Sequence, residues 1–311
     1  MYNIKLAPYV CNKFKNIERL FLRRLVMNEI PEDSFSDCKN LKSLILRTDQ
    51  FSNSYITNLP QNLLAGNPKL TNFEASLKDL HSVPTNFFIN NPNLYSISIK
   101  ESKIRTLPDN LFKPLTNLHE LYLSKNNFYN IKIAWFENLE NLQILYLNDN
   151  HITDIPKNAF TSLKNLAEIW LSYNRIRVIH SDSFGQHPKL EHINLMYNSI
   201  NAIDEKFIDN ISVKYLQFLS NSCTSDQFYD KDGDKTDLKE GLKTCFKNYQ
   251  PRVEVGGRIN VDESEPEPTT PAVSLFDQVD GEELLKNFMF LFNQVKQEMD
   301  KQSTTTENLN V

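Results

Sequence analysis

The chain has 311 residues and carries 34 basic against 39 acidic side chains, for a net charge of −5. Residues 251–311 hold 5 of these basic and 12 of these acidic side chains, so the first 250 residues are nearly neutral. A nearly neutral surface is poorly suited to neutralising phosphates, and we expect no nucleic-acid partner. No apolar run approaches the about 18 residues of a membrane-spanning helix, so we expect no transmembrane segment.

Residues 1–16 are predicted to be a partial N-terminal cap. The opening MYNIKLAPYV lacks the apolar core of a signal peptide, and a repeated pattern starts almost at once. Either the protein is intracellular or the sequence lacks its true N-terminus, and the early start of the repeats favours truncation at or just before an N-terminal cap. Cys11 and Cys38 fall at apolar positions of the pattern; buried free thiols are the simpler interpretation, and a bridge between them is the alternative.

Residues 17–212 repeat one spacing, L-x-x-L-x-L-x-x-N-x-I, in about eight copies with a 24-residue period. Clear copies begin at Leu118, Leu142, Leu166 and Leu190, and looser ones at Ile17, Leu41, Leu70, Leu94 and Val213. Template positions 1, 4 and 6 point into the core, and each L-x-L is a short strand that pairs with the next copy. The pattern predicts an α/β-type solenoid with a parallel sheet on its concave face. Recurrent prolines favour an irregular convex side.

Two further periodic columns support this solenoid. An asparagine at template position 9 can bond the backbone of its own turn and of the next repeat. The copies that have it are Asn126, Asn150, Asn174, Asn198 and Asn221. The early copies lack it, so we expect a less regular N-terminal end. An aromatic column is predicted inside the convex side, formed by Phe112, Phe136, Phe160 and Phe184 and extended by Phe35, Leu64, Phe88 and Phe207.

Residues 213–250 are predicted to be the last repeat and a C-terminal cap. The final leucines have no following repeat to cover them, so the end must be sealed. We expect a disulfide between Cys223 and Cys245 to do this, which implies an oxidising compartment; two free thiols in the cap are the alternative. Asn210, in Asn-Ile-Ser, is the one clear N-glycosylation sequon.

The segment Asp230–Gly241 begins like a calcium-binding EF-hand loop, with aspartates at positions 1, 3 and 5. Its sixth position is Lys235 where the sharp turn needs Gly, and its twelfth is Gly241 where a bidentate Glu belongs. We interpret it as a solvated acidic turn. No His or Cys spacing indicates another metal site, and we expect no metal and no cofactor.

The composition changes after Pro251. Residues 251–274 are acidic and Pro-rich and are predicted to be a disordered linker, and residues 303–311 a disordered tail. Between them, residues 275–302 are predicted to be an amphipathic helix and a possible coiled coil. Its seam residues are spaced 3, 4, 3 and 4 apart: Leu285, Phe288, Phe292, Val295 and Met299. We expect this helix to pair with a helix of a second copy of the chain or of a different protein. Folding back onto the solenoid is one alternative; lying on a membrane is another, which the acidic polar face disfavours.

Template position 5 faces away from the leucines, because side chains alternate along a strand. It places Tyr122, Tyr146 and Trp170 in a ladder, and Tyr173 and Tyr197 at position 8 extend it toward one rim. Exposed aromatics with polar tips are typical of interfaces, so we expect a protein ligand on this face. The alternative is that these side chains only pack on one another.

Two other groups lie on the same predicted face. Glu168 and His192 occupy position 3 of adjacent copies and are expected to form a surface hydrogen-bonded pair; an acid–base site is the alternative, but no nucleophile accompanies them, and we expect no enzyme activity. A basic cluster near the N-terminus is interpreted as a solvated rim, with an acidic partner as the alternative; it comprises Arg19, Arg23, Arg24, Lys42 and Arg47.

The copies LHELYLSKNNF and LQILYLNDNHI and the cap NSCTSDQF with LKTCFKNY resemble the extracellular leucine-rich repeat family, whose fold is a horseshoe. With its helical C-terminal segment, the architecture resembles secreted insect leucine-rich repeat proteins, including the mosquito leucine-rich immune proteins. The resemblance implies a secreted, non-enzymatic recognition module, and an innate-immune adaptor that assembles through its helix. A truncated ectodomain of a cell-surface receptor or adhesion protein is the alternative. The chain has no cysteine after Cys245 for a covalent link between chains.

Overall fold

The computed structural model describes residues 11, 16–25, 27–48, 54–185, 187–224, 227–229 and 235–251. The chain divides into two compact units, Met1–Arg252 and Val253–Val311, and the second lies outside the described residues. The predicted linker, the amphipathic helix with its five seam residues, and the tail are therefore not described. The same holds for Asp230, Asp232 and Asp234 of the loop that resembles an EF-hand.

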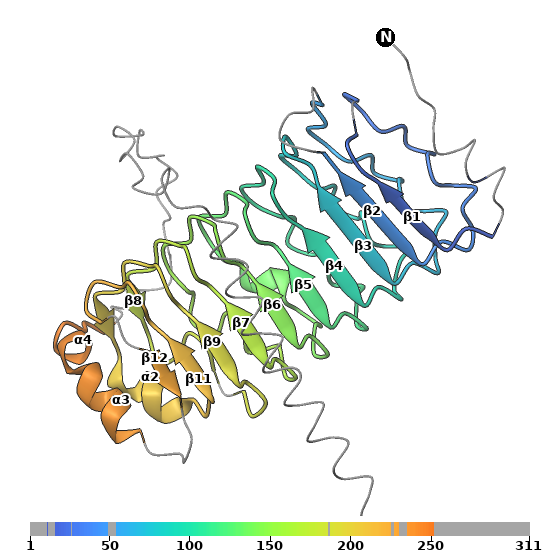
Figure 1. Cartoon of the computed structure of the whole chain (residues 1–311). Coiled ribbons are helices and arrows are strands. Elements are labelled where there is room, and N and C mark those ends of the chain that lie inside the picture. The colour runs from blue at the N-terminus through green and yellow to red at the C-terminus, as the bar shows by residue number, and fades with distance from the viewer. Residues whose placement is uncertain are drawn as a thin grey trace, which may run out of the picture. The chain divides into compact units, whose positions relative to one another are not determined.

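One ten-stranded sheet runs along the first unit, and its strands follow the order of the chain (Figure 1). The strands are β1 (Arg19–Leu22), β2 (Ser43–Arg47), β3 (Asn72–Ser76), β4 (Ser96–Ile99), β5 (Glu120–Tyr122), β6 (Ile144–Tyr146), β7 (Glu168–Trp170), β9 (His192–Asn194), β11 (Tyr215–Gln217) and β12 (Gln227–Tyr229). All neighbours are parallel except β11 and β12. The predicted parallel-sheet solenoid is confirmed.

The template positions coincide across the sheet. Leu121 of β5 lies opposite Leu145 of β6, and Leu145 lies opposite Ile169 of β7. These side chains are fully buried, as are the leucines two residues later, Leu123 and Leu147. Burying one such side chain contributes about 1.5–3 kcal/mol, so the repeated L-x-L pattern fixes the register of each strand on the next.

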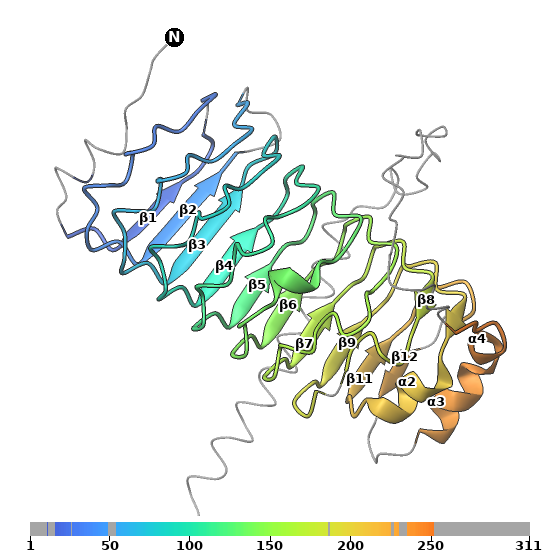
Figure 2. The ribbon, with the colours of Figure 1, turned by 180° about the vertical axis from the view of Figure 1, so that it is seen from behind.

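The side opposite the sheet is mostly turns (Figure 2). Its regular elements are the 3-10 helix η1 (Ile133–Trp135), the helix α2 (Glu205–Asn210), and the short parallel strands β8 (Val178–Ile179) and β10 (Ala202–Ile203). The predicted irregular convex side is confirmed. The helix α2 is a local departure, and Asp204 caps it by accepting a hydrogen bond from the Lys206 amide.

The predicted aromatic column stacks inside this side. Ring centroids are 5.6 Å apart from Phe136 to Phe160, 5.5 Å from Phe160 to Phe184, and 5.3 Å from Phe184 to Phe207. Trp135 is also fully buried there, and its indole N–H donates to the carbonyl of Leu107 at 3.0 Å. The sequence pattern did not single out Trp135, because it stands outside the template.

The asparagine column bonds its own turn as predicted, but its second partner is the preceding repeat and not the next one. The Asn150 amide nitrogen donates to the carbonyls of Leu123 and Leu147, both at 3.1 Å, and its oxygen accepts from the Phe128 amide at 3.1 Å. One side chain thus joins two consecutive turns. In the early repeats, Asn67 on the convex side also bonds the preceding repeat: its amide nitrogen donates to the carbonyls of Phe35 and Cys38.

Template position 8 adopts a left-handed backbone conformation. The φ angles are 54° at Lys125, 56° at Asp149, 54° at Tyr173 and 52° at Tyr197. Non-glycine residues avoid this region, because Cβ then crowds the following carbonyl. The hydrophobic template carries no signal for it, so this feature was not predicted.

Both ends carry a disulfide. Cys223 is bonded to Cys245, as predicted, and Cys11 to Cys38, so the simpler interpretation of two free thiols at the N-terminal end was wrong. At the C-terminal end, the helices α3 (Thr236–Gly241) and α4 (Lys243–Lys247) follow β12, and α4 packs on β10.

Lys235 explains one departure from the calcium-loop pattern. Its ammonium donates to the carbonyls of Ile208 and Ile211 at the C-terminal end of α2. Cations are favourable at that end of a helix, where carbonyls lack partners. Lys235 therefore serves the packing of the cap, which a glycine could not do.

Candidate functional site

Five rings form a continuous row on the outward face of the sheet. Tyr122 lies opposite Tyr146, and Tyr146 opposite Trp170, with ring centroids 5.0 and 5.1 Å apart. Trp170 contacts the His192 ring at 4.9 Å, and His192 contacts Tyr215 at 5.9 Å. We call these five side chains the aromatic row; it crosses β5, β6, β7, β9 and β11.

Tyr215 was missed by the sequence reasoning. It occupies position 3, the position of His192, while the ladder was traced along position 5. Because the row steps from position 5 at Trp170 to position 3 at His192, it runs obliquely across the strands. A comparison of both outward columns would have found it.

Tyr122 and Tyr146 of the row are partly buried, and both stay protonated. Burial raises the pKa of Tyr146 above its ordinary value, and the nearby Glu168 carboxylate raises it further. Burial likewise raises the pKa of Tyr122, with Glu120 as the next cause. Both hydroxyls therefore remain neutral at physiological pH; that of Tyr122 donates to Glu120 Oε2 at 3.4 Å, and that of Tyr146 can donate to a ligand.

Tyr173 and Tyr197 form a stacked pair in the turns after β7 and β9. Their ring centroids are 4.4 Å apart, with an angle of 8° between the rings. Burial, followed by the contact with Tyr197, raises the pKa of Tyr173 to about 12. The structure thus brings the two residues together at the rim, as the spacing predicted, but on strained left-handed backbone.

Glu168 and His192 do lie opposite each other, in register on β7 and β9. The expected hydrogen bond between them is nevertheless wrong. His192 Nε2 bonds Gln217 Oε1 at 3.0 Å, and Glu168 accepts from the Trp170 indole N–H at 3.4 Å. Each side chain is directed to a different neighbour, because the ring of Trp170 packs against His192. This geometry does not assemble an acid–base pair.

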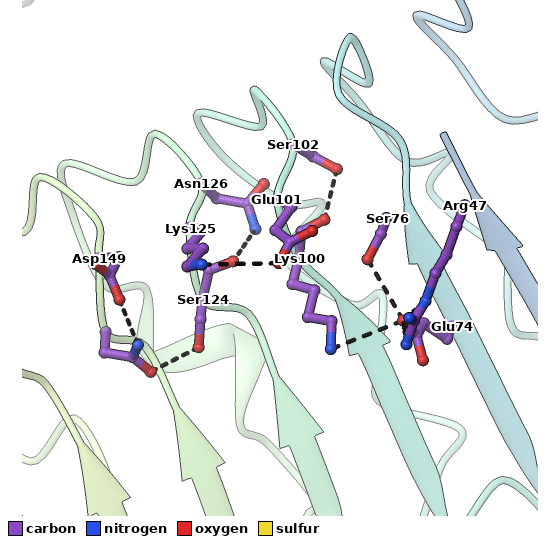
Figure 3. A network of polar contacts seen from close by, with 11 residues as sticks. Arg47, Glu74, Ser76, Lys100, Glu101, Ser102, Ser124, Lys125, Asn126 and Asp149 are labelled. Atoms are coloured by element: carbon purple, nitrogen blue, oxygen red, sulfur yellow. Dashed lines mark hydrogen bonds and ion pairs between the residues drawn. The ribbon is translucent and has the colours of Figure 1, made fainter. Parts of the chain in front are cut away.

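A polar cluster lies on the same face at β2 to β4 (Figure 3). Glu74 is mostly buried, with its side chain 14% exposed, and its Oε1 accepts from Arg47 Nε at 2.6 Å. Lys100 Nζ lies 3.7 Å from the same oxygen. The hydrogen bond to Glu74 raises the pKa of Arg47.

The predicted basic cluster is therefore partly neutralised. Arg47 is paired with Glu74, and Lys42 is paired with Glu18 at 2.7 Å. Exposed pairs such as Lys42–Glu18 are screened by water, so they organise the surface more than they stabilise it. Two of the five basic side chains of the cluster are thus engaged within the chain.

Within the described residues, no three His, Cys, Asp or Glu side chains converge as a metal site. In that same part of the chain, none of the helices is long and apolar enough to cross a membrane.

These features define a class of protein: a parallel solenoid of 24-residue repeats that presents one sheet face. Residues 116–176 and 164–222 match a family model described as Leucine rich repeat, and residues 5–129 match one described as BspA type Leucine rich repeat region (6 copies). Together the matched segments run from residue 5 to residue 222, which is more than half of the chain. The chain belongs to the leucine-rich repeat family.

Among solved structures, a TLR13–ssRNA13 complex aligns with a TM-score of 0.61 and 24% identity, over 70% of this chain and 31% of that one. A leucine-rich repeat protein of Leptospira interrogans aligns with a TM-score of 0.57 and 23% identity, over 73% of this chain and 53% of that one. These likenesses show the fold. The leucine-rich repeat domain of APL1 aligns less well, with a TM-score of 0.43 and 20% identity, over 68% of this chain and 64% of that one.

The chain thus spans less than two thirds of the length of each of these proteins. A search of curated proteins found no match.

Proposed function

We propose that the chain is an extracellular, non-enzymatic recognition module whose aromatic row binds a protein ligand. The observation that carries this proposal is the continuity of the row, in which successive ring centroids lie 4.9 to 5.9 Å apart across five strands. Such rings are already held by their neighbours, so binding orders little that was free beforehand. Aromatic side chains at the centre of an interface carry much of its binding energy.

The alternative of mere local packing accounts for the contacts but not for the position of the row. Residues with a hydrophobic role alone would be expected in the core, where every L-x-L leucine of β5 to β7 already lies. The row adds a second, outward layer of rings with polar tips. That composition matches the centre of a protein interface, where Tyr and Trp are enriched.

The two disulfides support an oxidising, extracellular setting, because such bonds persist there and are rare in the cytosol. Asn210 is exposed at the end of α2, where a glycan would meet no core residue. Expression behind a secretory leader, with and without glycosidase treatment, tests this: a mobility shift is expected for the native chain and not for Asn210→Gln. Absence of the shift in the native chain would refute glycosylation at Asn210.

Assembly through residues 275–302 is part of the proposal and rests on the 3, 4, 3, 4 apolar spacing alone. Together with the resemblance to secreted insect immune proteins, it supports an adaptor that joins a ligand to a second protein. Light scattering of the full chain and of residues 1–251 compares their masses. If the helix pairs with itself, the full chain is expected to form an oligomer while residues 1–251 remain monomeric. A monomer in both cases would exclude self-pairing.

The binding proposal is tested by immobilising the chain and measuring capture of protein ligands from extracellular fluid. Trp170→Ala, in the middle of the row, is expected to weaken capture by about 30-fold, as truncation of a central aromatic costs at least about 2 kcal/mol. Tyr146→Ala is expected to act in the same direction.

The matched control is Tyr129→Ala, because Tyr129 is 46% exposed but lies outside the row. This variant is expected to capture as well as the native chain. Thermal unfolding of all variants separates lost contacts from lost folding. Undiminished capture by folded Trp170→Ala and Tyr146→Ala proteins would rule out the row as the binding surface.

A further inference from the structure

A hollow of about 250 Å³ lies in the outward face of β2 to β5, next to the aromatic row. Its lining includes Ile45, Glu74, Ser96, Ser98, Lys100 and Tyr122. It exists because position 5 changes from Glu74 to Ser98 and then to Tyr122 on three neighbouring strands. The short serine leaves a gap between two larger side chains, and the small side chain of Ser96 widens it.

The acceptor within the hollow is already engaged. Glu74 Oε1 accepts from Arg47 at 2.6 Å and from the Ser76 hydroxyl at 3.4 Å, and it contacts Lys100 at 3.7 Å (Figure 3). A single carboxylate thus faces two cations. The local balance of these three groups is one excess positive charge.

Two hydrogen-bond donors that line the hollow, Ser98 and Lys100, lack an acceptor among the described residues for at least one of their protons. Ser98 is only 8% exposed, and its hydroxyl has no hydrogen-bond partner among the described residues. Lys100 Nζ has only the 3.7 Å ion contact with Glu74, which is too long for a hydrogen bond. A buried hydroxyl without a partner is unusual and calls for an explanation, such as a group supplied by a ligand.

We propose that this hollow binds the carboxylate of an aspartate or glutamate side chain presented by the protein ligand on the aromatic row. The carboxylate accepts hydrogen bonds from Lys100 Nζ and from the Ser98 hydroxyl, and the ring of Tyr122 packs against the methylene groups. Cavities that hold small molecules are typically about 300–1,000 Å³, so this one suits a single side chain better than a cofactor. This inference rests on the proposed function, since it assigns one contact of the same ligand.

The probe is N-acetyl-glutamate N-methylamide, and its neutral counterpart is N-acetyl-glutamine N-methylamide. Both are titrated at pH 7 into the full isotope-labelled chain while the amide signals are followed by NMR. The glutamate compound is expected to shift the signals of β3 to β5 in a saturable way. The glutamine compound, nearly equal in shape, is expected to bind at least about tenfold more weakly, because it lacks the charge.

Lys100→Met and Ser98→Ala remove the two proposed donors one at a time. Each is expected to weaken binding of the glutamate probe, Lys100→Met by about tenfold or more. The matched control is Lys125→Met, since Lys125 carries the same charge, pairs with Glu101 at 3.8 Å, and does not line the hollow. It is expected to bind the probe as the native chain does.

Equal shifts with both probes, shifts confined to other strands, or unchanged binding in both folded variants would overturn the proposal. These results are independent of the capture experiment, since the probe needs no natural ligand. Loss of capture in Trp170→Ala together with no probe binding would leave the aromatic row as the binding surface and remove the carboxylate site. Binding of the probe together with undiminished capture by folded Trp170→Ala protein would keep the carboxylate site and exclude the aromatic row as the binding surface.

Discussion

Ser98 is buried with its hydroxyl unpaired, and such a group costs about 1–3 kcal/mol when nothing satisfies it. We therefore expect Ser98→Ala to leave the unliganded chain as stable as before or to raise its free energy of unfolding by about 1 kcal/mol. Urea unfolding monitored by tryptophan fluorescence measures this. A gain in stability combined with weaker carboxylate binding would place Ser98 among residues kept for binding at some cost in stability.

Ser124 provides the contrast for this measurement. It is equally buried, but its hydroxyl donates to Asn148 Oδ1 at 2.6 Å. Ser124→Ala is expected to lower the free energy of unfolding by about 1 kcal/mol, because a buried bond is lost. If Ser98→Ala destabilises the chain as much as Ser124→Ala does, then Ser98 has a structural partner and the hollow loses its unpaired donor.

Single residues were predictable where the template fixes them, as for Asn150 or Tyr146. They were not predictable where the property depends on a neighbour one repeat away. The hollow at Ser98 follows from the size of Glu74 and Tyr122 on the adjacent strands, and the partner of His192 follows from Gln217 on β11. The left-handed conformation at Tyr173 is a property of the turn, and hydrophobic spacing does not encode it.

Between elements, the asparagine column replaces the hydrogen bonds that turns lack. Removing the Asn150 side chain leaves the buried Phe128 amide without a partner, whereas the carbonyls of Leu123 and Leu147 each lose one of two donors and keep the bonds from Asn126 and Asn174. We expect Asn150→Ala to lower the free energy of unfolding by about 1–3 kcal/mol, since one buried group, the Phe128 amide, is left unsatisfied. Urea unfolding measures the loss.

The control for this substitution is Asn141→Ala. Asn141 also bonds a carbonyl of the preceding repeat, that of Thr116 at 2.9 Å, but it is exposed. Water can replace that bond, so a change within about 0.5 kcal/mol is expected. Similar losses for the two variants would show that the column does not depend on burial.

The strands followed from the L-x-L spacing, because burial of alternate side chains selects one register. The L-x-L spacing did not predict the secondary structure at the C-terminal end of the array. The helix α2 and the antiparallel strand β12 belong to the last repeat and the cap, where the repeating environment ceases and local contacts decide. Lys235 is such a contact, since it binds the carbonyls at the end of α2.

For the whole array, each repeat contacts chiefly its neighbours, so the loss of one end is expected to spread only a short distance. Replacing Cys223 and Cys245 together by Ser opens a link over 22 residues and is expected to cost roughly 3 kcal/mol. Hydrogen exchange is expected to speed up at β11 and β9 and to stay unchanged at β2 to β4. Uniformly faster exchange along the sheet would instead mean that the array unfolds as one cooperative unit.

The antiparallel strand β12 also limits where further repeats can be added to the sheet. A further repeat needs a strand of the same direction to pair with, and β12 offers the opposite one beside β11. Extra copies of the 24-residue unit can therefore be inserted only before β11. A duplication of residues 142–165 would lengthen the aromatic row by one strand and leave both disulfides in place. The length of the aromatic row can thus be varied in whole repeats while the two ends stay constant.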